Sequence, residues 1–125
     1  MAPKELKDTF TYLVSALARD FPDLAYLHLT LPRVSGVIDH TDKGEEESID
    51  FLAKIWSPRP LMLAGAYSPE LARADAEKYQ NTMIAFGRYY TSNPDLPTRI
   101  KKNIPFVRYN RKTFYSPGPE GEFVD

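Results

Sequence analysis

The sequence predicts an α/β fold in which three parallel strands alternate with helices. Short apolar runs and amphipathic stretches take turns along the chain, and no two apolar runs follow each other directly. The first run, LAYLHLTL at 24–31, is apolar on both faces at most positions, which is typical of a strand in a parallel sheet. Strands joined through helices imply right-handed parallel crossovers, so we expect the order α-β-α-β-α-β-α.

The first half of the chain carries the first strand and two helices. Between about 4 and 19, apolar side chains recur at helical spacing and predict an amphipathic helix. Pro22 prevents this helix from continuing into the strand at 24–31. A polar loop at 32–45 follows, and then a second helix is expected at about 46–56. The stripe of the first helix consists of Leu6, Phe10, Leu13, Val14 and Leu17.

The second half carries the other two strands. RPLMLAG at 59–65 and TMIAFG at 82–87 are the second and third predicted strands. Between them, Ser68-Pro69-Glu70 predicts a helix start, with Ser as the cap and Pro in the first turn. Asn93-Pro94-Asp95 repeats this chemistry before a short helix that we expect to reach about Lys102.

We expect a single domain over 1–125 in which residues 103–125 form an extended aromatic tail. This tail contains prolines and glycines and has no sustained period, so it predicts at most one further turn of helix. Four aromatic residues indicate that it packs on the domain. They are Phe106, Tyr109, Phe114 and Tyr115.

Composition excludes several classes of function. The chain has 125 residues, a formal charge of −1, two histidines and no cysteine, so we expect no disulfide, no metal site and no nucleic-acid partner. No apolar run approaches the ~20 residues of a membrane span, and the first residues lack the apolar core of a signal peptide. We therefore expect a cytosolic protein with no membrane partner.

Positive charge is concentrated near the end of the chain. Between Phe86 and Tyr115, seven cations stand against one anion, Asp95. Either a small anionic ligand or a solvated basic face would account for this excess. The cations are Arg88, Arg99, Lys101, Lys102, Arg108, Arg111 and Lys112.

Two predicted strands end in glycine, at the sheet edge where parallel folds bind their ligands. The second strand ends in LAGAY and the third in AFGRYY. Glycine allows a ligand to approach the backbone, and the guanidinium of Arg88 suits a phosphate. Gly65, Gly87 and Arg88 are therefore candidates for a phosphate site.

Several motifs in this order resemble the C-terminal part of the Old Yellow Enzyme family. They are AYLHLTLPRVSG, LAGAYSPELA, IAFGRYYTSNPDLPTRIKKNIP and YNRKTFY, and together they cover nearly the whole chain. FLAKIW and RPLMLAGAYSPE most resemble the fungal subgroup that acts in secondary metabolism. The resemblance implies a partial (β/α)₈ barrel, with strands six to eight of a fold that needs eight strands and ~250 residues.

The family binds FMN and reduces activated alkenes with electrons from NADPH. The resemblance implies that Gly65, Ala66, Gly87 and Arg88 hold the FMN phosphate, and that Tyr115 lies over the mouth of the active site. Position 66 is often asparagine or glycine in the family. With alanine there, a backbone contact would survive and a side-chain contact would not.

The family's first five strands, its carbonyl-orienting pair and its proton-donating tyrosine have no counterpart in this sequence. Neither His28 nor His40 can replace them. One face of a three-stranded sheet and both its edges would remain open, so we expect a homo-oligomer or a partner chain to complete the fold.

Three hypotheses follow. The favoured one is a flavin-independent isomerase or cyclase of secondary metabolism acting on a small molecule, including a pericyclase such as a Diels–Alderase, with no cofactor. The first alternative is an FMN- and NADPH-dependent ene-reductase that needs an oligomer or partner, and the second is a non-catalytic accessory fragment. The candidate catalytic residues are Arg88, Tyr115 and Tyr26, and the candidate substrate-binding residues are Tyr67, Tyr89, Tyr90 and His28.

Overall fold

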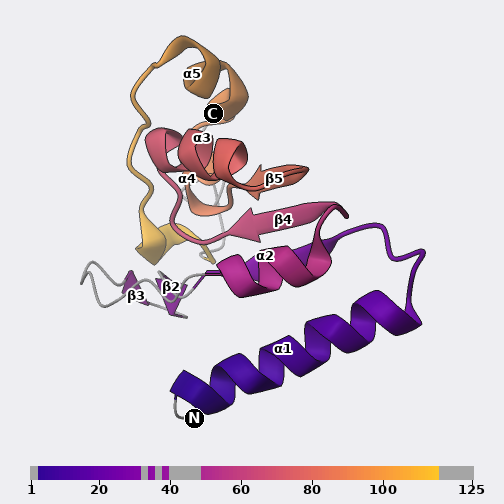
Figure 1. Ribbon diagram of the computed structural model, residues 1–125. Helices are drawn as coiled ribbons and strands as arrows, with labels where there is room; N and C mark the ends of the chain where they lie inside the picture. Colours follow the sequence, from indigo (N-terminus) through magenta and orange to yellow (C-terminus); the bar gives the residue numbers. More distant parts are fainter. Residues whose placement is uncertain (1–2, 32–33, 36–37, 40–48, 116–125) are drawn as a thin grey trace.

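The computed structural model describes residues 3–31, 34–35, 38–39 and 49–115. Helices and strands alternate as expected, with two additional short strands and one additional short helix (Figure 1). In order, the elements are α1 (Pro3–Asp20), β1 (Leu27–Thr30), β2 (Val34–Ser35), β3 (Ile38–Asp39), α2 (Asp50–Trp56), β4 (Leu61–Ala64), α3 (Pro69–Lys78), β5 (Thr82–Ala85), α4 (Arg88–Ser92), α5 (Leu96–Lys102) and the 3₁₀ turn η1 (Arg111–Thr113).

The three expected strands form one parallel sheet in the order β1-β4-β5, which confirms the predicted fold class. Figure 1 shows β4 and β5 pointing the same way, with α2 between β4 and α1. The register aligns His28 with Met62 and Met62 with Met83. The carboxyl ends of all three strands therefore meet along one edge of the sheet.

The two faces of the sheet differ in their covering. One face carries Leu61 and Leu63, which are buried in a core shared with the helices. On the other face His28 and Thr30 are exposed, and Met83 keeps 43% of its surface accessible. As the sequence predicted, none of the described residues covers this face of the sheet. The buried core consists of Val14, Leu31, Leu52, Trp56, Leu61, Leu63, Tyr67 and Ala72.

Several elements differ from the predictions, and each of the three strands is shorter than predicted. Within the expected polar loop, β2 and β3 form a small antiparallel pair, whereas His40 lies outside the described residues. The described part of α2 begins at Asp50, and residues 46–48 are not described. Helix α4 occupies residues for which no helix or strand was predicted. None of the helices in the described part of the chain is long and apolar enough to cross a membrane.

The expected start of α3 is confirmed. Ser68 is the N-cap, its side chain accepts a hydrogen bond of 3.2 Å from the Leu71 amide, and Pro69 is the first helical residue. Asn93 does not repeat this role, because it ends α4 instead of capping α5. The described part of the tail contains the one expected turn of helix, η1.

Candidate functional site

The candidate site lies where β4 and β5 end. These strands pair in parallel with Ala64 beside Ala85, so the loops that begin at Gly65 and Phe86 leave the sheet side by side. The loop after β4 contains Gly65 and Ala66, and the loop after β5 contains Gly87. The structure thus brings together the glycines that the sequence had placed at separate strand ends.

Position 65 needs a glycine because a side chain there would collide with the neighbouring chain segment. Its φ of +128° belongs to a region that favours glycine, and a Cβ there would lie 3.0 Å from the carbonyl oxygen of Leu31. The next residue, Ala66, also has a positive φ, of +46°. Two successive residues with positive φ turn the chain sharply as it leaves β4.

At Gly87, by contrast, a side chain would not collide with any atom of the described residues. Its φ is −102°, and a Cβ placed on it would meet nothing within 4 Å among the described residues. The space in front of this glycine is therefore open to a ligand. Arg88 follows as the first residue of α4 and is half-buried.

The backbone N–H groups of these loops make the site suitable for an anion. No acceptor among the described residues takes the N–H of Ala66 or Gly87. Open amides of this kind, beside an arginine, can bind phosphate. The residues present therefore fit the phosphate group of FMN, through the amides of Ala66 and Gly87 and the guanidinium of Arg88.

Tyr67, a candidate substrate residue, lies in the core. Only 2% of its surface is accessible, and its hydroxyl donates a hydrogen bond of 2.7 Å to Asp75. Its ring contacts Phe86 at a centroid distance of 6.4 Å. Tyr67 thus packs β4 against α3, and its ring is not presented to solvent.

Tyr89 and Tyr115 belong to a continuous series of aromatic contacts, which does not include Tyr90. Phe106 of the tail contacts both Phe86 and Tyr89, at centroid distances of 6.1 and 5.1 Å. The series shows that the described part of the tail packs on the domain, and its last described member is Tyr115, which is 92% accessible. Tyr90 is also exposed. In order, the series is Tyr67, Phe86, Phe106, Tyr89, Tyr109, Phe114 and Tyr115.

Tyr26 and His28 lie away from these loops. Tyr26 directly precedes β1, whose first residue pairs with the first residue of β4, so it lies at the amino end of the sheet. His28 follows on the open face, in register with Met62. The structure therefore does not bring Tyr26 together with Arg88 in one pocket.

Asn93 is a structural residue that the sequence assigned to a helix start. Its side chain is fully buried, and its Nδ2 donates to the carbonyl oxygens of Tyr89 and Val107 at 2.8 and 2.9 Å. Its Oδ1 accepts from the Val107 amide at 2.7 Å. Asn93 thus fastens the tail to α4. The order Asn-Pro-Asp carries no signal for this role, because the partner lies 14 residues further along the chain.

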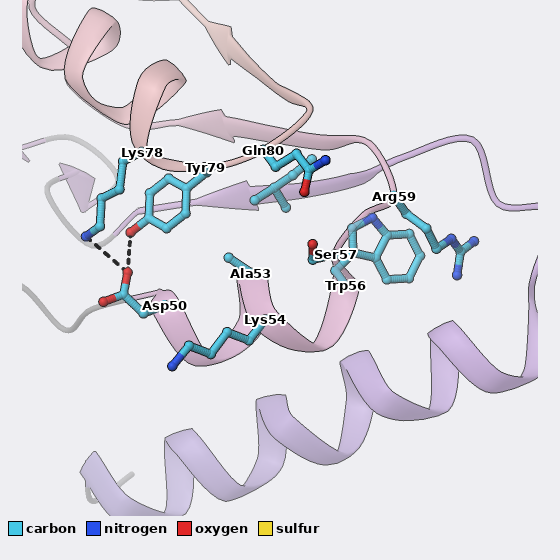
Figure 2. Close-up of a pocket in the computed structure, with 10 residues that line it drawn as sticks. Asp50, Ala53, Lys54, Trp56, Ser57, Arg59, Lys78, Tyr79 and Gln80 are labelled. Atoms are coloured by element: carbon cyan, nitrogen blue, oxygen red, sulfur yellow. Dashed lines mark hydrogen bonds and ion pairs between the residues drawn. The ribbon is translucent and has the colours of Figure 1, made fainter.

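A hollow lies at the opposite end of the sheet, beside the start of β4 (Figure 2). It has a volume of about 360 Å³. At one side, Asp50 Oδ1 accepts from the Tyr79 hydroxyl at 2.6 Å and lies 3.1 Å from the Lys78 ammonium. Burial raises the pKa of Tyr79, and hydrogen bonds to Tyr79 and Asp50 raise the pKa of Lys78. Within the described part of the chain, no group of acidic or histidine side chains could hold a metal ion.

The chain is similar to known flavin-dependent oxidoreductases and their relatives. A model of the NADH:flavin oxidoreductase / NADH oxidase family matches residues 2–106. The aldehyde reductase FrzD of Cladobotryum sp is 41% identical over 98% of this chain and 32% of its own length. A Claviceps fusiformis protein named "Probable inactive dehydrogenase easA" is 34% identical over 97% of this chain and 33% of its own length.

A solved structure supports the same relationship. The crystal structure of Old Yellow Enzyme from Pichia sp. AKU4542 matches 82% of this chain and 25% of that chain, with 27% identity and a TM-score of 0.60. The chain spans about a third of the length of the curated relatives named above.

Proposed function

Since this chain belongs to the NADH:flavin oxidoreductase / NADH oxidase family, we propose that it supplies the FMN-phosphate site of an Old Yellow Enzyme-like reductase. The observation that carries the proposal is the pair of loops after β4 and β5, in which the amides of Ala66 and Gly87 have no acceptor among the described residues. An anion placed between the loops would satisfy both loops at once.

Each residue has a distinct task in this proposal. The amides of Ala66 and Gly87 donate hydrogen bonds to the phosphate oxygens, Gly65 forms the turn that places Ala66, and the guanidinium of Arg88 offsets the charge of the phosphate. The open space at Gly87 lets the phosphate approach the backbone. When bound, FMN supplies hydride transfer from a reduced nicotinamide dinucleotide to an activated alkene.

The open face of the sheet would form part of the barrel interior. A flavin ring needs a preformed cup that buries most of its surface, and three strands offer only one wall. We therefore propose that further strands, from additional polypeptide or from a second copy of this chain, cover His28, Thr30 and Met83. The molar mass of the purified chain in solution tests the second possibility, because a monomer at micromolar concentration would contradict self-association.

The phosphate site is tested by comparing FMN with riboflavin, which lacks the phosphate. We expect FMN to bind at least about tenfold more tightly, because charge-assisted hydrogen bonds to phosphate are lost with riboflavin. Arg88→Ala should weaken FMN binding and leave riboflavin binding unchanged, whereas Lys101→Ala on α5 should alter neither. Equal affinities for FMN and riboflavin would contradict the proposal.

A second candidate function is the flavin-independent isomerase or cyclase. One observation favours it: a relative that retains this segment at 34% identity is named an inactive dehydrogenase. In this candidate the exposed rings of Tyr90 and Tyr115 and the charge of Arg88 would orient a substrate without redox chemistry. A chain that excludes both FMN and riboflavin, yet binds an unsaturated small molecule through Arg88, would favour it over the reductase.

A further inference from the structure

Helix α4, which carries Arg88, is too short to hold its own position. It has five residues, none of them fully buried, and no side chain caps its first turn. The Tyr90 amide donates to the Gly87 carbonyl at 2.9 Å, and the Thr91 hydroxyl donates to the Arg88 carbonyl at 2.7 Å. A helix of about one turn is unstable by itself, because most helical stability in proteins comes from packing. The position of Arg88 therefore depends on what α4 packs against.

The two loops of the candidate site differ in the support that the sheet gives them. β4 is the central strand, and at its end the Leu31 amide of the neighbouring segment donates to the Ala64 carbonyl at 2.8 Å. β5 lies at an edge of the described sheet, so the loop that contains Gly87 follows a strand with one neighbour. The β5 loop and α4 therefore need support from outside the sheet.

The ring of Phe106 in the tail contacts the residues on both sides of Gly87-Arg88. Its centroid lies 6.1 Å from that of Phe86 and 5.1 Å from that of Tyr89. The Tyr89 ring also contacts Tyr109, at a centroid distance of 5.0 Å. The tail thus packs against the residue before Gly87 and the residue after Arg88.

The side chain of Asn93 joins the end of α4 to the same part of the tail. It is fully buried, donates to the carbonyl oxygens of Tyr89 and Val107 at 2.8 and 2.9 Å, and accepts from the Val107 amide at 2.7 Å. The Ser92 hydroxyl donates to the same Val107 carbonyl at 2.8 Å. Breaking these bonds would leave buried polar groups unsatisfied, so they strongly favour one position of α4 against the tail.

Resting on the proposed function, we propose that Asn93, Phe106 and Val107 form a positioning clamp for the phosphate site. The clamp residues do not touch the phosphate. They hold α4 where the Gly87 amide and the Arg88 guanidinium can reach an anion bound by the loop after β4. Because hydrogen bonds weaken steeply as their geometry departs from the optimum, a displaced α4 loses affinity for the phosphate.

The coupling between clamp and phosphate is reciprocal. If a closed clamp favours phosphate binding, bound phosphate must favour the closed clamp to the same extent. The Val107 amide reports the closed state, because it donates to Asn93. At saturation, we expect FMN to slow hydrogen exchange of this amide by about threefold more than riboflavin does, since riboflavin lacks the phosphate.

The clamp is also tested by the ratio of FMN to riboflavin affinity, measured by fluorescence titration of the 125-residue chain. This ratio does not depend on the folded fraction, because both flavins require the folded chain. Asn93→Ala should reduce it from at least about tenfold to about threefold or less. Ser92→Ala, a milder change that keeps the Asn93 bonds, should lower it about twofold. Val14→Ala, at a core position that is 1% exposed, should lower stability and leave the ratio unchanged.

An unchanged ratio in Asn93→Ala would overturn the proposal, as would an unchanged ratio in Ser92→Ala if Asn93→Ala does not fold. Equal exchange of the Val107 amide with FMN and with riboflavin would also overturn it. Failure of the proposed function gives a different result, because the unchanged chain would then bind FMN and riboflavin equally, and site and clamp would fall together. A tenfold ratio that survives the loss of the Asn93 side chain would refute the clamp alone.

Discussion

The two ends of the parallel sheet differ in how far their polar groups are hydrogen-bonded within the protein. At the amino end, Arg59 Nη2 donates to the carbonyl oxygens of Phe21, Pro22 and Leu24 at 2.8, 3.1 and 3.1 Å. At the carboxyl end, the amides of Ala66 and Gly87 have no acceptor among the described residues. One end uses its hydrogen-bonding groups to hold the fold, and at the other end we propose that they bind a ligand.

Packing reinforces this contrast. The Arg59 guanidinium stacks 3.8 Å from the ring of Trp56, whose indole N–H donates to the Pro60 carbonyl at 2.8 Å. These contacts join the turn after α1 to the start of β4. In parallel β/α folds, the amino end of the strands generally serves stability and the carboxyl end serves binding. Substitutions at the two ends should therefore affect different measurements.

The largest effect is expected from Trp56→Ala at the amino end. Trp56 is 1% exposed, and removing its ring should lower the free energy of unfolding by about 3–5 kcal/mol. Urea denaturation measures this loss. Trp56→Phe keeps most of the packing and should cost less, because only the indole hydrogen bond and part of the ring are lost. A loss under 1 kcal/mol for Trp56→Ala would contradict the role given to this end.

The second prediction contrasts two glycines at the carboxyl end. Gly65→Ala should lower the free energy of unfolding by about 1–3 kcal/mol, because of its positive φ and the nearby Leu31 carbonyl. Gly87→Ala should change stability by no more than about 0.5 kcal/mol, since its Cβ meets open space. It should instead weaken FMN binding, because the methyl group occupies space proposed for the phosphate. Similar stability losses in the two variants would contradict this distinction.

The smallest effect concerns the hydrogen bond between Tyr79 and Asp50. Burial raises the pKa of the Tyr79 hydroxyl above its ordinary value of 10.0, so its contribution to stability is present below that pH and is lost as pH rises through the higher folded value. Near pH 8, Tyr79→Phe should cost about 1 kcal/mol. Above about pH 10 the difference between the two proteins should shrink. Denaturation midpoints across this range measure it, and a difference that grew with pH would contradict the assigned cause.

Local sequence chemistry predicted the elements that depend on near neighbours. The short apolar runs became β1, β4 and β5, as expected for strands that are apolar on both faces. Ser68 caps α3 through an amide three residues away. The same chemistry at Asn93 was misleading. Its partners, the carbonyls of Tyr89 and Val107, meet only after the tail has folded back on α4.

The candidate site, too, has features that the sequence predicted and features that only the tertiary structure showed. The sequence by itself determined the parallel α/β fold and the ends of its strands, and therefore the edge where Gly65 and Gly87 meet, because parallel strands align their carboxyl ends. Only the tertiary structure decided that Tyr67 is buried while Tyr115 is exposed, and that Arg108 lies on Tyr89 and Tyr109. These placements depend on contacts between residues far apart in the chain, whose distances no local pattern encodes.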